Sequence, residues 1–268
     1  MLLAENKKIQ RLEELTLNTA PAIHQHFYDG WVLRASNTET HRSNSVTALH
    51  ASTLPLNEKV AYCEQWCRVH QQPIIFRVND ALSPAGFDDL LAAQGYIKVA
   101  ATSVMTTDID LFSESLDLPP GVKLAERDLA DSLTDLHRMK GTAPTIMVHE
   151  IERQALWRGP QIVLSLRSIN GLVCSGMARL EGGHVGQFDI YTPENQRGKG
   201  YALILVSHLL AWGASHGAGT AFLQVLETNQ PAISVYKRTG FTSCYSYSSR
   251  LKEECADEEN AKIHHDEC

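Results

Sequence analysis

The chain has 268 residues, of which 43% are hydrophobic and 21% are charged, and its formal net charge is −7. This is the composition of a globular protein long enough for two domains, and the negative charge disfavours nucleic-acid binding, which needs a basic face. No stretch approaches the roughly 18 apolar residues of a membrane span, and the N-terminal apolar run is too short for a signal peptide. We therefore expect a soluble, cytoplasmic protein with no nucleic-acid or membrane partner.

The six cysteines include no C-x-x-C pair. Because the sequence holds enough apolar material for a core, we expect reduced thiols and no disulfide framework. Cys63 and Cys67 are spaced to share one face of a predicted helix, where they could bind a metal together. No second ligand pair lies near them in the sequence, so we favour packing in the core and predict no metal site.

The first half of the chain is predicted to alternate strands and helices. Val60, Cys63 and Cys67 recur at helical spacing, and Gly95 is suited to end a short helix. The apolar runs beside these helices are typical of strands. The expected elements are a strand at 46–51, a helix at 56–71, a strand at 73–78, a short helix at 87–94 and a strand at 96–104.

The second half is predicted to begin with a strand and two helices and then to turn back on itself. Asn170-Gly171 is a strong hairpin turn, and Gly182-Gly183 marks another turn. Pro231 suits the first turn of a helix that Gly240 ends. The expected elements are a strand at 122–127, helices at 129–139 and 147–157, strands at 162–166, 173–180 and 186–192, a helix at about 200–217, a strand at 220–226, a short helix after Pro231 and a last strand at 241–250.

The order strand–helix–strand–helix–strand occurs in both halves. The junction Gly95-Tyr96 of the first half matches Gly240-Phe241 of the second. Such alternation is common in α/β proteins, but the matching junctions favour a duplication. The Pro/Gly linker at 118–121 then divides the chain into domains at 1–118 and 119–252, with a polar tail at 253–268. The predicted fold class is α/β, with a mixed and mostly antiparallel sheet flanked by helices.

The segment Gln196-Arg197-Gly198-Lys199-Gly200-Tyr201-Ala202 joins a predicted strand to a predicted helix. Its glycines let a ligand approach the backbone, and the first N–H groups of the helix lack intrahelical partners. With the helix dipole and two basic side chains, these groups suit a pyrophosphate. The segment lacks the Walker A and Rossmann glycine patterns and fits R-x-x-G-x-[GA]. Taken alone, it could equally be a basic, solvated turn.

A second motif follows one helix and one strand later. It has the form N-x-x-A-x-x-x-Y-x-x-x-G-F and runs from Asn229 to Phe241. The two motifs at this separation resemble the GNAT superfamily of N-acyltransferases, and the resemblance covers roughly residues 122–250. It implies a GNAT fold, preceded by a smaller GNAT-like domain, and acetyl-CoA as cosubstrate without a metal.

The resemblance also implies which residues bind the cosubstrate. Asn229 would hydrogen-bond the cofactor arm, although an N-cap role alone would explain this residue. The residues implied to contact the pantetheine arm are Ile190, Tyr191 and Thr192, and those implied to bind the pyrophosphate are Arg197, Gly198, Lys199, Gly200, Tyr201 and Ala202.

Two further residues receive catalytic roles. Tyr236 lies two helical turns beyond Asn229, and the resemblance implies that its phenol reaches the sulfur of coenzyme A and protonates the departing thiolate. The alternative is a tyrosine packed on the sheet. The base that deprotonates the amine could be Asp189, Glu227 or a water, and we favour Asp189.

The first half has a different sequence where the second has its glycine-rich loop. Residues 52–58 hold no glycine and no arginine, and Glu58 lies at the helix start. Such a segment should repel a pyrophosphate. We therefore expect a degenerate GNAT-like domain that has lost cofactor binding and could shape the acceptor cleft.

The function favoured by these observations is transfer of an acetyl group from acetyl-CoA to a primary amine by direct attack in a ternary complex. The acceptor would be a small-molecule or peptide amine, and the protein a monomer or homodimer. The alternatives are an acyl-CoA-binding regulatory module without turnover and an interaction scaffold without a ligand. Tyr236 favours turnover because a module that only binds needs no proton donor.

Overall fold

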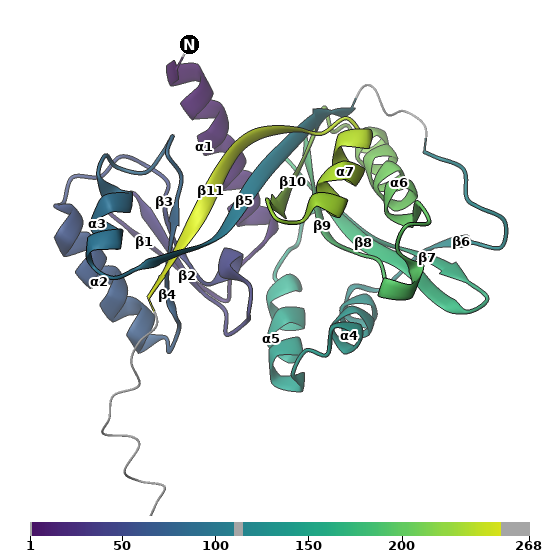
Figure 1. The fold of residues 1–268 in the computed structure, drawn as a ribbon, viewed down its shortest axis with the longest axis horizontal. Coiled ribbons are helices and arrows are strands. Elements are labelled where there is room, and N and C mark those ends of the chain that lie inside the picture. Colours follow the sequence, from purple (N-terminus) through teal and green to yellow (C-terminus); the bar gives the residue numbers. More distant parts are fainter. Residues whose placement is uncertain (1, 110–114, 253–268) are drawn as a thin grey trace, which may run out of the picture.

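The computed structural model describes residues 2–109 and 115–252 of the chain, so the predicted polar tail at 253–268 lies outside the described residues (Figure 1). Within them, the strands form one sheet of eleven strands. Two neighbouring pairs, β3–β4 and β9–β10, are parallel and the others are antiparallel, which confirms the predicted fold class. In sheet order the strands are β1 (His24–Tyr28), β2 (Trp31–Ala35), β3 (Val46–Ala48), β4 (Ile74–Val78), β11 (Thr242–Lys252), β5 (Ile97–Asp108), β10 (Thr220–Leu226), β9 (His184–Tyr191), β8 (Gly171–Glu181), β7 (Gln161–Ser168) and β6 (Lys123–Glu126).

The predicted helices are confirmed to within a few residues at their ends. The helix expected at 147–157 begins earlier, at Pro144, because Ala143 is its N-cap and its first turn suits a proline. The predicted strand at 46–51 is also shorter than expected and ends at Ala48. The α-helices are α1 (Leu2–Thr19), α2 (Leu56–Val69), α3 (Phe87–Ala93), α4 (Leu129–Lys140), α5 (Pro144–Gln154), α6 (Tyr201–Ser215) and α7 (Gln230–Arg238), and short 3₁₀ turns lie at η1 (His41–Ser43) and η3 (Glu194–Gln196).

Three elements near the N-terminus had not been predicted: α1, β1 and β2. The two strands form a hairpin in which Tyr28 pairs with Trp31 across the two-residue turn Asp29-Gly30. Both turn residues have positive φ, 41° and 81°, as a hairpin turn of this length requires. Asp-Gly is a strong turn signal, so this hairpin could have been found from the sequence.

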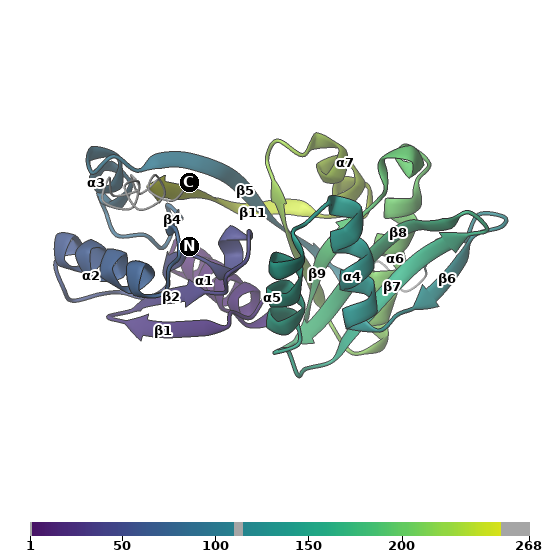
Figure 2. The ribbon, with the colours of Figure 1, turned by 90° about the horizontal axis from the view of Figure 1, so that it is seen from below.

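The last strands of the two halves are exchanged. The first half, up to residue 118, contributes β5, which pairs with β10 of the second half. The last strand of the second half, β11, pairs in turn with β4 of the first half and with β5. Figure 1 shows these two long strands running side by side between the halves, and Figure 2 shows them from below. The boundary at 118–119 stays a prediction, but the sheet crosses it without interruption.

The apolar residues form a core in each half and a third cluster between them. Trp31 and Phe76 belong to the core of the first half, and Leu205 and Leu209 to that of the second. In the third cluster, α1 packs its buried residues Leu12 and Leu15 against side chains of β5, β8, β9, β10 and β11. This helix therefore contacts strands from both halves.

Three arginines from different elements bind the C-terminal end of α1. Arg34 of β2 donates to the carbonyls of Leu17, at 3.1 Å, and Ala20. Arg179 of β8 donates to the carbonyl of Thr19 at 2.6 Å. Arg153 of α5 donates to the carbonyl of Pro21 at 3.0 Å. Cations suit the negative end of a helix dipole, and these three join α1 to both halves. No helix among the described residues is long and apolar enough to span a membrane.

Candidate active site

A groove of about 550 Å³ lies on the second half between the end of β9, the start of α6 and α7. It brings together ten of the predicted cofactor-binding and catalytic residues. Lys199 and Asp189 are not among the residues that line it. Its lining comprises Ile190, Tyr191, Thr192, Gln196, Arg197, Gly198, Gly200, Tyr201, Ala202, Leu203, Asn229, Pro231, Ala232, Val235, Tyr236 and Arg238.

The groove opens where two parallel strands separate. β9 pairs with β10 only over the first three residues of each strand, up to Gly186 and Phe222. Further along, β9 carries a bulge against β8, and Asp189 in this bulge has a positive φ of 52°. The edge of β9 at Ile190 and Tyr191 consequently faces the groove with no partner strand on that side among the described residues.

The start of α6 forms one wall of the groove. Its N-cap is Gly200 with φ of 81°, and no side chain caps its first turn among the described residues. Gly198 also has a positive φ of 77°, and a Cβ at either glycine would meet nothing within 4 Å. Backbone conformation rather than crowding therefore accounts for glycine at both positions. The result is a helix start whose N–H groups are available to an anion.

The two basic residues of the loop differ in their surroundings. Arg197 lines the groove, donates from Nε to the carbonyl of Thr192 at 3.3 Å and forms an exposed ion pair with Glu194. Lys199 instead donates from Nζ to the carbonyl of Asn195 at 3.1 Å and to Gln196 Oε1 at 2.9 Å. Of the two, only Arg197 is placed at the groove, and the role of Lys199 stays a prediction.

α7 supplies the opposite wall. Asn229 is its N-cap and accepts a hydrogen bond from the N–H of Ala232 at 3.2 Å, while also lining the groove. Tyr236 lies two turns further on, 7% exposed, with its ring at the edge of Phe241. Burial raises the pKa of Tyr236 to about 12, so its phenol keeps its proton at neutral pH. A buried, protonated phenol beside the groove can donate a proton there.

The two candidate bases are placed differently. Asp189 precedes Ile190 in the bulge of β9, and its carboxylate accepts a hydrogen bond from Gln154 Nε2 at 3.2 Å. Glu227 accepts a hydrogen bond from the hydroxyl of Ser246 at 2.7 Å and does not line the groove. The structure therefore places Asp189 next to the groove and gives Glu227 another partner.

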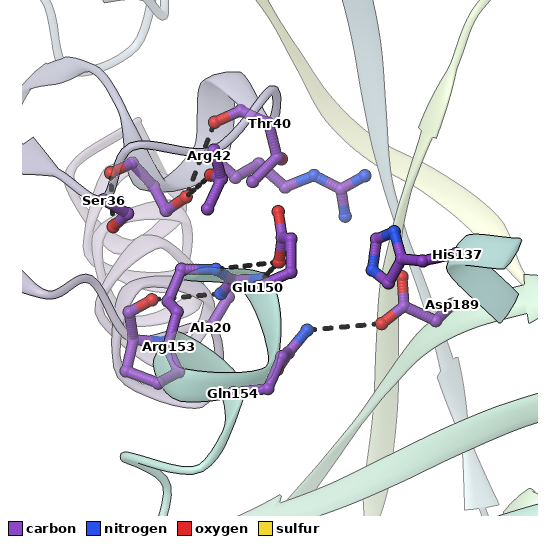
Figure 3. A network of polar contacts seen from close by, with 12 residues as sticks. Ala20, Ser36, Thr40, Arg42, His137, Glu150, Arg153, Gln154 and Asp189 are labelled. Carbon is purple, nitrogen blue, oxygen red and sulfur yellow. Dashed lines mark hydrogen bonds and ion pairs between the residues drawn. The ribbon is translucent and has the colours of Figure 1, made fainter. Parts of the chain in front are cut away.

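Asp189 belongs to a group of polar side chains where the two halves meet, which we call the junction network. Figure 3 shows the Arg42 guanidinium, the Glu150 carboxylate, the His137 ring and the Asp189 carboxylate turned toward one another. They come from η1 of the first half and from α5, α4 and β9 of the second. Sequence analysis singled out only Asp189, because no local pattern shows that the other three lie beside it.

Some charged groups of this network are paired, and one has no hydrogen-bond or ion-pair partner among the described residues. Glu150 and Arg153, both nearly buried, form an ion pair at 2.5 Å. Burial lowers the pKa of His137, which favours a neutral ring at pH 7, and its Nδ1 lies 3.1 Å from Thr142 Oγ1. The guanidinium of Arg42 makes no hydrogen bond or ion pair with any other described residue, yet its charge acts on the Tyr236 phenol, whose pKa it lowers against the larger effect of burial.

Cys63 and Cys67 both pack in the core of the first half, as favoured from the sequence. Burial raises the pKa of the Cys63 thiol well above its usual value. Among the described residues, no group of three or more histidine, cysteine or acidic side chains is arranged to hold a metal ion. The residues His264, His265 and Cys268 lie outside the described part of the chain.

The chain that carries this groove, with its separating parallel strands, uncapped helix start and tyrosine on the facing helix, has the GNAT fold. Solved structures share it. A GCN5-related N-acetyltransferase from Kribbella flavida has a TM-score of 0.70 at 13% identity, covering 93% of this chain and 97% of that one. A tandem GNAT protein from the clavulanic acid biosynthesis pathway has a TM-score of 0.61 at 15% identity, covering 78% of this chain and 75% of that one.

Sequence comparison identifies the family. A family sequence model described as "Probable histone acetyltransferase Rv0428c C-terminal" matches residues 6–248, and the chain belongs to this family. The uncharacterized N-acetyltransferase YobR of Bacillus subtilis (strain 168) is 27% identical over 248 residues, which are 91% of this chain and 98% of that protein. The protein is thus an N-acetyltransferase enzyme of the GNAT superfamily, which confirms the resemblance found in its sequence.

Proposed function

We propose that the protein transfers the acetyl group of acetyl-CoA to a primary amine within a ternary complex. The groove carries this proposal, because one cavity contains an uncapped helix start, an unpaired strand edge and a buried phenol. These three features suit the three parts of an acyl-CoA donor: a diphosphate, a pantetheine amide chain and a thioester sulfur.

In this proposal acetyl-CoA lies along the groove, with its diphosphate at the start of α6 and its pantetheine arm along β9. The diphosphate binds the N–H groups at the start of α6, where Arg197 adds a positive charge. The pantetheine arm pairs with the edge of β9 at Ile190 and Tyr191, as an added strand pairs with a sheet. A backbone N–H of this edge would then donate to the thioester carbonyl and stabilise the oxyanion that forms there.

The chemistry needs no covalent enzyme intermediate. The nitrogen of a neutral amine attacks the carbonyl carbon, a C–N bond forms and the C–S bond breaks as the tetrahedral intermediate collapses. The phenol of Tyr236 gives its proton to the departing sulfur. The proton lost by the amine passes to Asp189, directly or through a water, and the neutral His137 beside it can share that proton.

The first half, on this proposal, is a degenerate GNAT-like domain that binds no coenzyme A and helps to form the acceptor site. Two contacts support it. His149 of α5 bonds through Nδ1 with the carbonyl of Asn37 in the first half at 3.1 Å, and Arg153 bonds with the carbonyl of Pro21. Arg42 extends from the first half toward Asp189, and its charge acts on Tyr236.

The decisive experiment compares two glycine variants of the same helix. Gly200→Glu places a carboxylate at the start of α6 and should abolish binding of coenzyme A in calorimetry. It should also abolish release of thiol from acetyl-CoA with a panel of primary amines. Gly217→Glu is the matched control, because Gly217 has φ of 79° at the far end of α6 and its Cβ would also meet open space. Both variants carry a similar backbone cost of about 1–3 kcal/mol.

The outcomes are distinct. Binding lost in Gly200→Glu and kept in Gly217→Glu supports the assigned groove. Equal binding by Gly200→Glu and the parent protein would contradict it. If the parent protein binds coenzyme A but releases no thiol with any amine, the regulatory-module alternative replaces the enzymatic one.

A further inference from the structure

The junction network contains one positive side chain that is partly buried and unpartnered. Arg42 of η1 makes no side-chain hydrogen bond or ion pair with the described residues, although its side chain is only partly exposed. Glu150, an acidic group of the same network, is already paired with Arg153 at 2.5 Å. An arginine fork held in such a place suits a planar anion such as a carboxylate.

Two buried side chains form hydrogen bonds with the backbone of the loop that carries Arg42. Arg34, 2% exposed, donates from Nη1 to the carbonyl of Arg42 at 3.0 Å. The side chain of Asn44, equally buried, accepts from the N–H of Ser36 at 2.7 Å and donates to the carbonyls of Thr38 and Thr40 at 2.7 and 3.0 Å. These bonds fix the backbone of the loop and leave the Arg42 guanidinium available to a ligand.

The other side of the network offers hydrogen-bond acceptors. Gln154 is 5% exposed and its Oε1 is buried without a partner among the described residues. Gln154 Nε2 donates a hydrogen bond to the carboxylate of Asp189. An ionised carboxylate has no N–H or O–H to donate, so Asp189 cannot satisfy Gln154 Oε1. A buried acceptor without a donor costs free energy, and an amine with N–H groups would supply that donor.

Both sides of the network lie near the reacting groups. Asp189 is adjacent in sequence to Ile190, which lines the groove, and the charge of Arg42 acts on Tyr236, which lines it too. One small molecule could therefore reach Arg42 with one end and the thioester with the other. A simple diamine fits poorly, because its second ammonium group would face the Arg42 guanidinium.

We propose that the acceptor is an amine that also carries a carboxylate, in the simplest case a free amino acid. Its carboxylate pairs with Arg42, and its amine lies between Asp189 and Gln154. The carboxylate takes no part in the reaction: the C–N bond forms, the C–S bond breaks, and the anion stays paired with the guanidinium. This inference rests on the proposed acetyl transfer and adds to it the class of acceptor and a specificity residue supplied by the first half.

The test is thiol release from saturating acetyl-CoA with matched pairs of amines. The series runs from glycine and β-alanine to 6-aminohexanoate and L-lysine, each paired with its carboxamide, and cadaverine serves as a dication. The best carboxylate should exceed its carboxamide in kcat/KM by roughly 10- to 100-fold, the usual range for a hydrogen-bonded charge pair. Most of the difference should appear in KM, because the pair exists equally in the ground state and the transition state.

Variants assign the preference to Arg42. Arg42→Gln should reduce the ratio between carboxylate and carboxamide to near one, and Arg42→Lys should retain part of it because the charge remains. Arg158→Gln, at an exposed position between α5 and β7, is the matched control and should keep the full ratio. The Arg42 variants should fold, since Arg34 binds the backbone carbonyl at this position rather than the side chain.

Each outcome bears on a different claim. Equal turnover of carboxylates and carboxamides, a preference for cadaverine, or a carboxylate preference that survives in Arg42→Gln would overturn the inference and leave the acetyl transfer intact. No thiol release with any amine would overturn the proposed function and this inference with it.

Discussion

The carboxylate of Asp29 accepts a hydrogen bond from the backbone N–H of Leu54 at 2.9 Å. It also accepts from the N–H and hydroxyl of Thr53 and from Lys59 Nζ. The N–H groups of Leu54 and Thr53, which lower the pKa of Asp29 well below its usual range, precede α2 in the segment that takes the place of the glycine-rich loop before α6. The first half therefore satisfies this segment with an anion of its own.

The first prediction concerns the number of coenzyme sites. With Asp29 bound to the segment before α2, an external diphosphate would meet both an occupied site and a negative charge. Calorimetric titration of the parent protein should show a single coenzyme A bound per chain, and Gly200→Glu should show none. A second binding event, or a residual site in Gly200→Glu, would mean that the first half has kept a coenzyme site.

The second prediction concerns Tyr236. Tyr236→Phe removes the proton donor but keeps the ring that packs on Phe241, so kcat should fall by roughly 10²- to 10⁴-fold, the usual contribution of a general acid. Affinity for coenzyme A, measured by calorimetry, should stay unchanged. Tyr62→Phe in the first half is the control and should keep its activity. A Tyr236→Phe variant with the parent kcat would remove this residue from the mechanism.

The pH dependence of turnover follows from the same phenol. Burial raises the pKa of Tyr236 to about 12, and below its pKa the group holds the proton that it must donate. Turnover that depends on this proton is therefore present at lower pH and is lost as the pH rises toward about 12. In a pH profile of kcat, no decline due to this residue should occur below roughly pH 10. A decline centred near the ordinary tyrosine pKa, absent from Tyr236→Phe, would show that the phenol is not buried in the working enzyme.

The fourth prediction concerns the buried ion pair that joins α1 to the sheet. Glu13 Oε2 lies 3.0 Å from Arg77 Nη2, with the two side chains 1% and 3% exposed, and Glu13 Oε1 accepts from the hydroxyl of Tyr245 at 2.7 Å. Glu13→Ala leaves Arg77 buried without its partner and should lower the free energy of unfolding by about 3–5 kcal/mol.

A second ion pair on the same helix provides the control. Arg11 and Glu14 lie 3.1 Å apart but are 45% and 34% exposed, so Arg11→Ala should cost at most about 1 kcal/mol. Denaturant unfolding measures both variants. Equal losses in the two would mean that Glu13 does not stabilise the junction of α1 with β4 and β11.

Most of the fold could be predicted from local patterns, and the exceptions have physical reasons. The helices and strands expected from the sequence are marked by apolar residues and by glycine or proline near their ends. The buried face of α1 includes Glu13 and Thr16 among its leucines, and Glu13 bonds with Arg77 of β4, so part of this buried face is polar in the sequence. The strand exchange could not be predicted, since β5 and β11 have the same pattern whether they pair within their own half or with the other.

The candidate site also has one part that sequence motifs predict and another part that they do not. Gly200, Asn229 and Tyr236 belong to two contiguous motifs, and the structure brings them together around one groove. Arg42 and His137 belong to no motif. Arg42 approaches Asp189 because the two halves pack together at α5 and η1, whereas His137 lies on α4 of the same half as Asp189. Sequence spacing carries no information about such a contact.

The exchanged strands also affect how the protein is made. β4 leaves the ribosome early, but its neighbour β11 is the last described strand of the chain. At a synthesis rate of about 5–20 residues per second, the roughly 160 residues between them take about 10 to 30 s to appear. During this time the edge of β4 that β11 will cover stays open to other strands, so the half that is synthesised first completes its sheet last and depends longest on protection from aggregation.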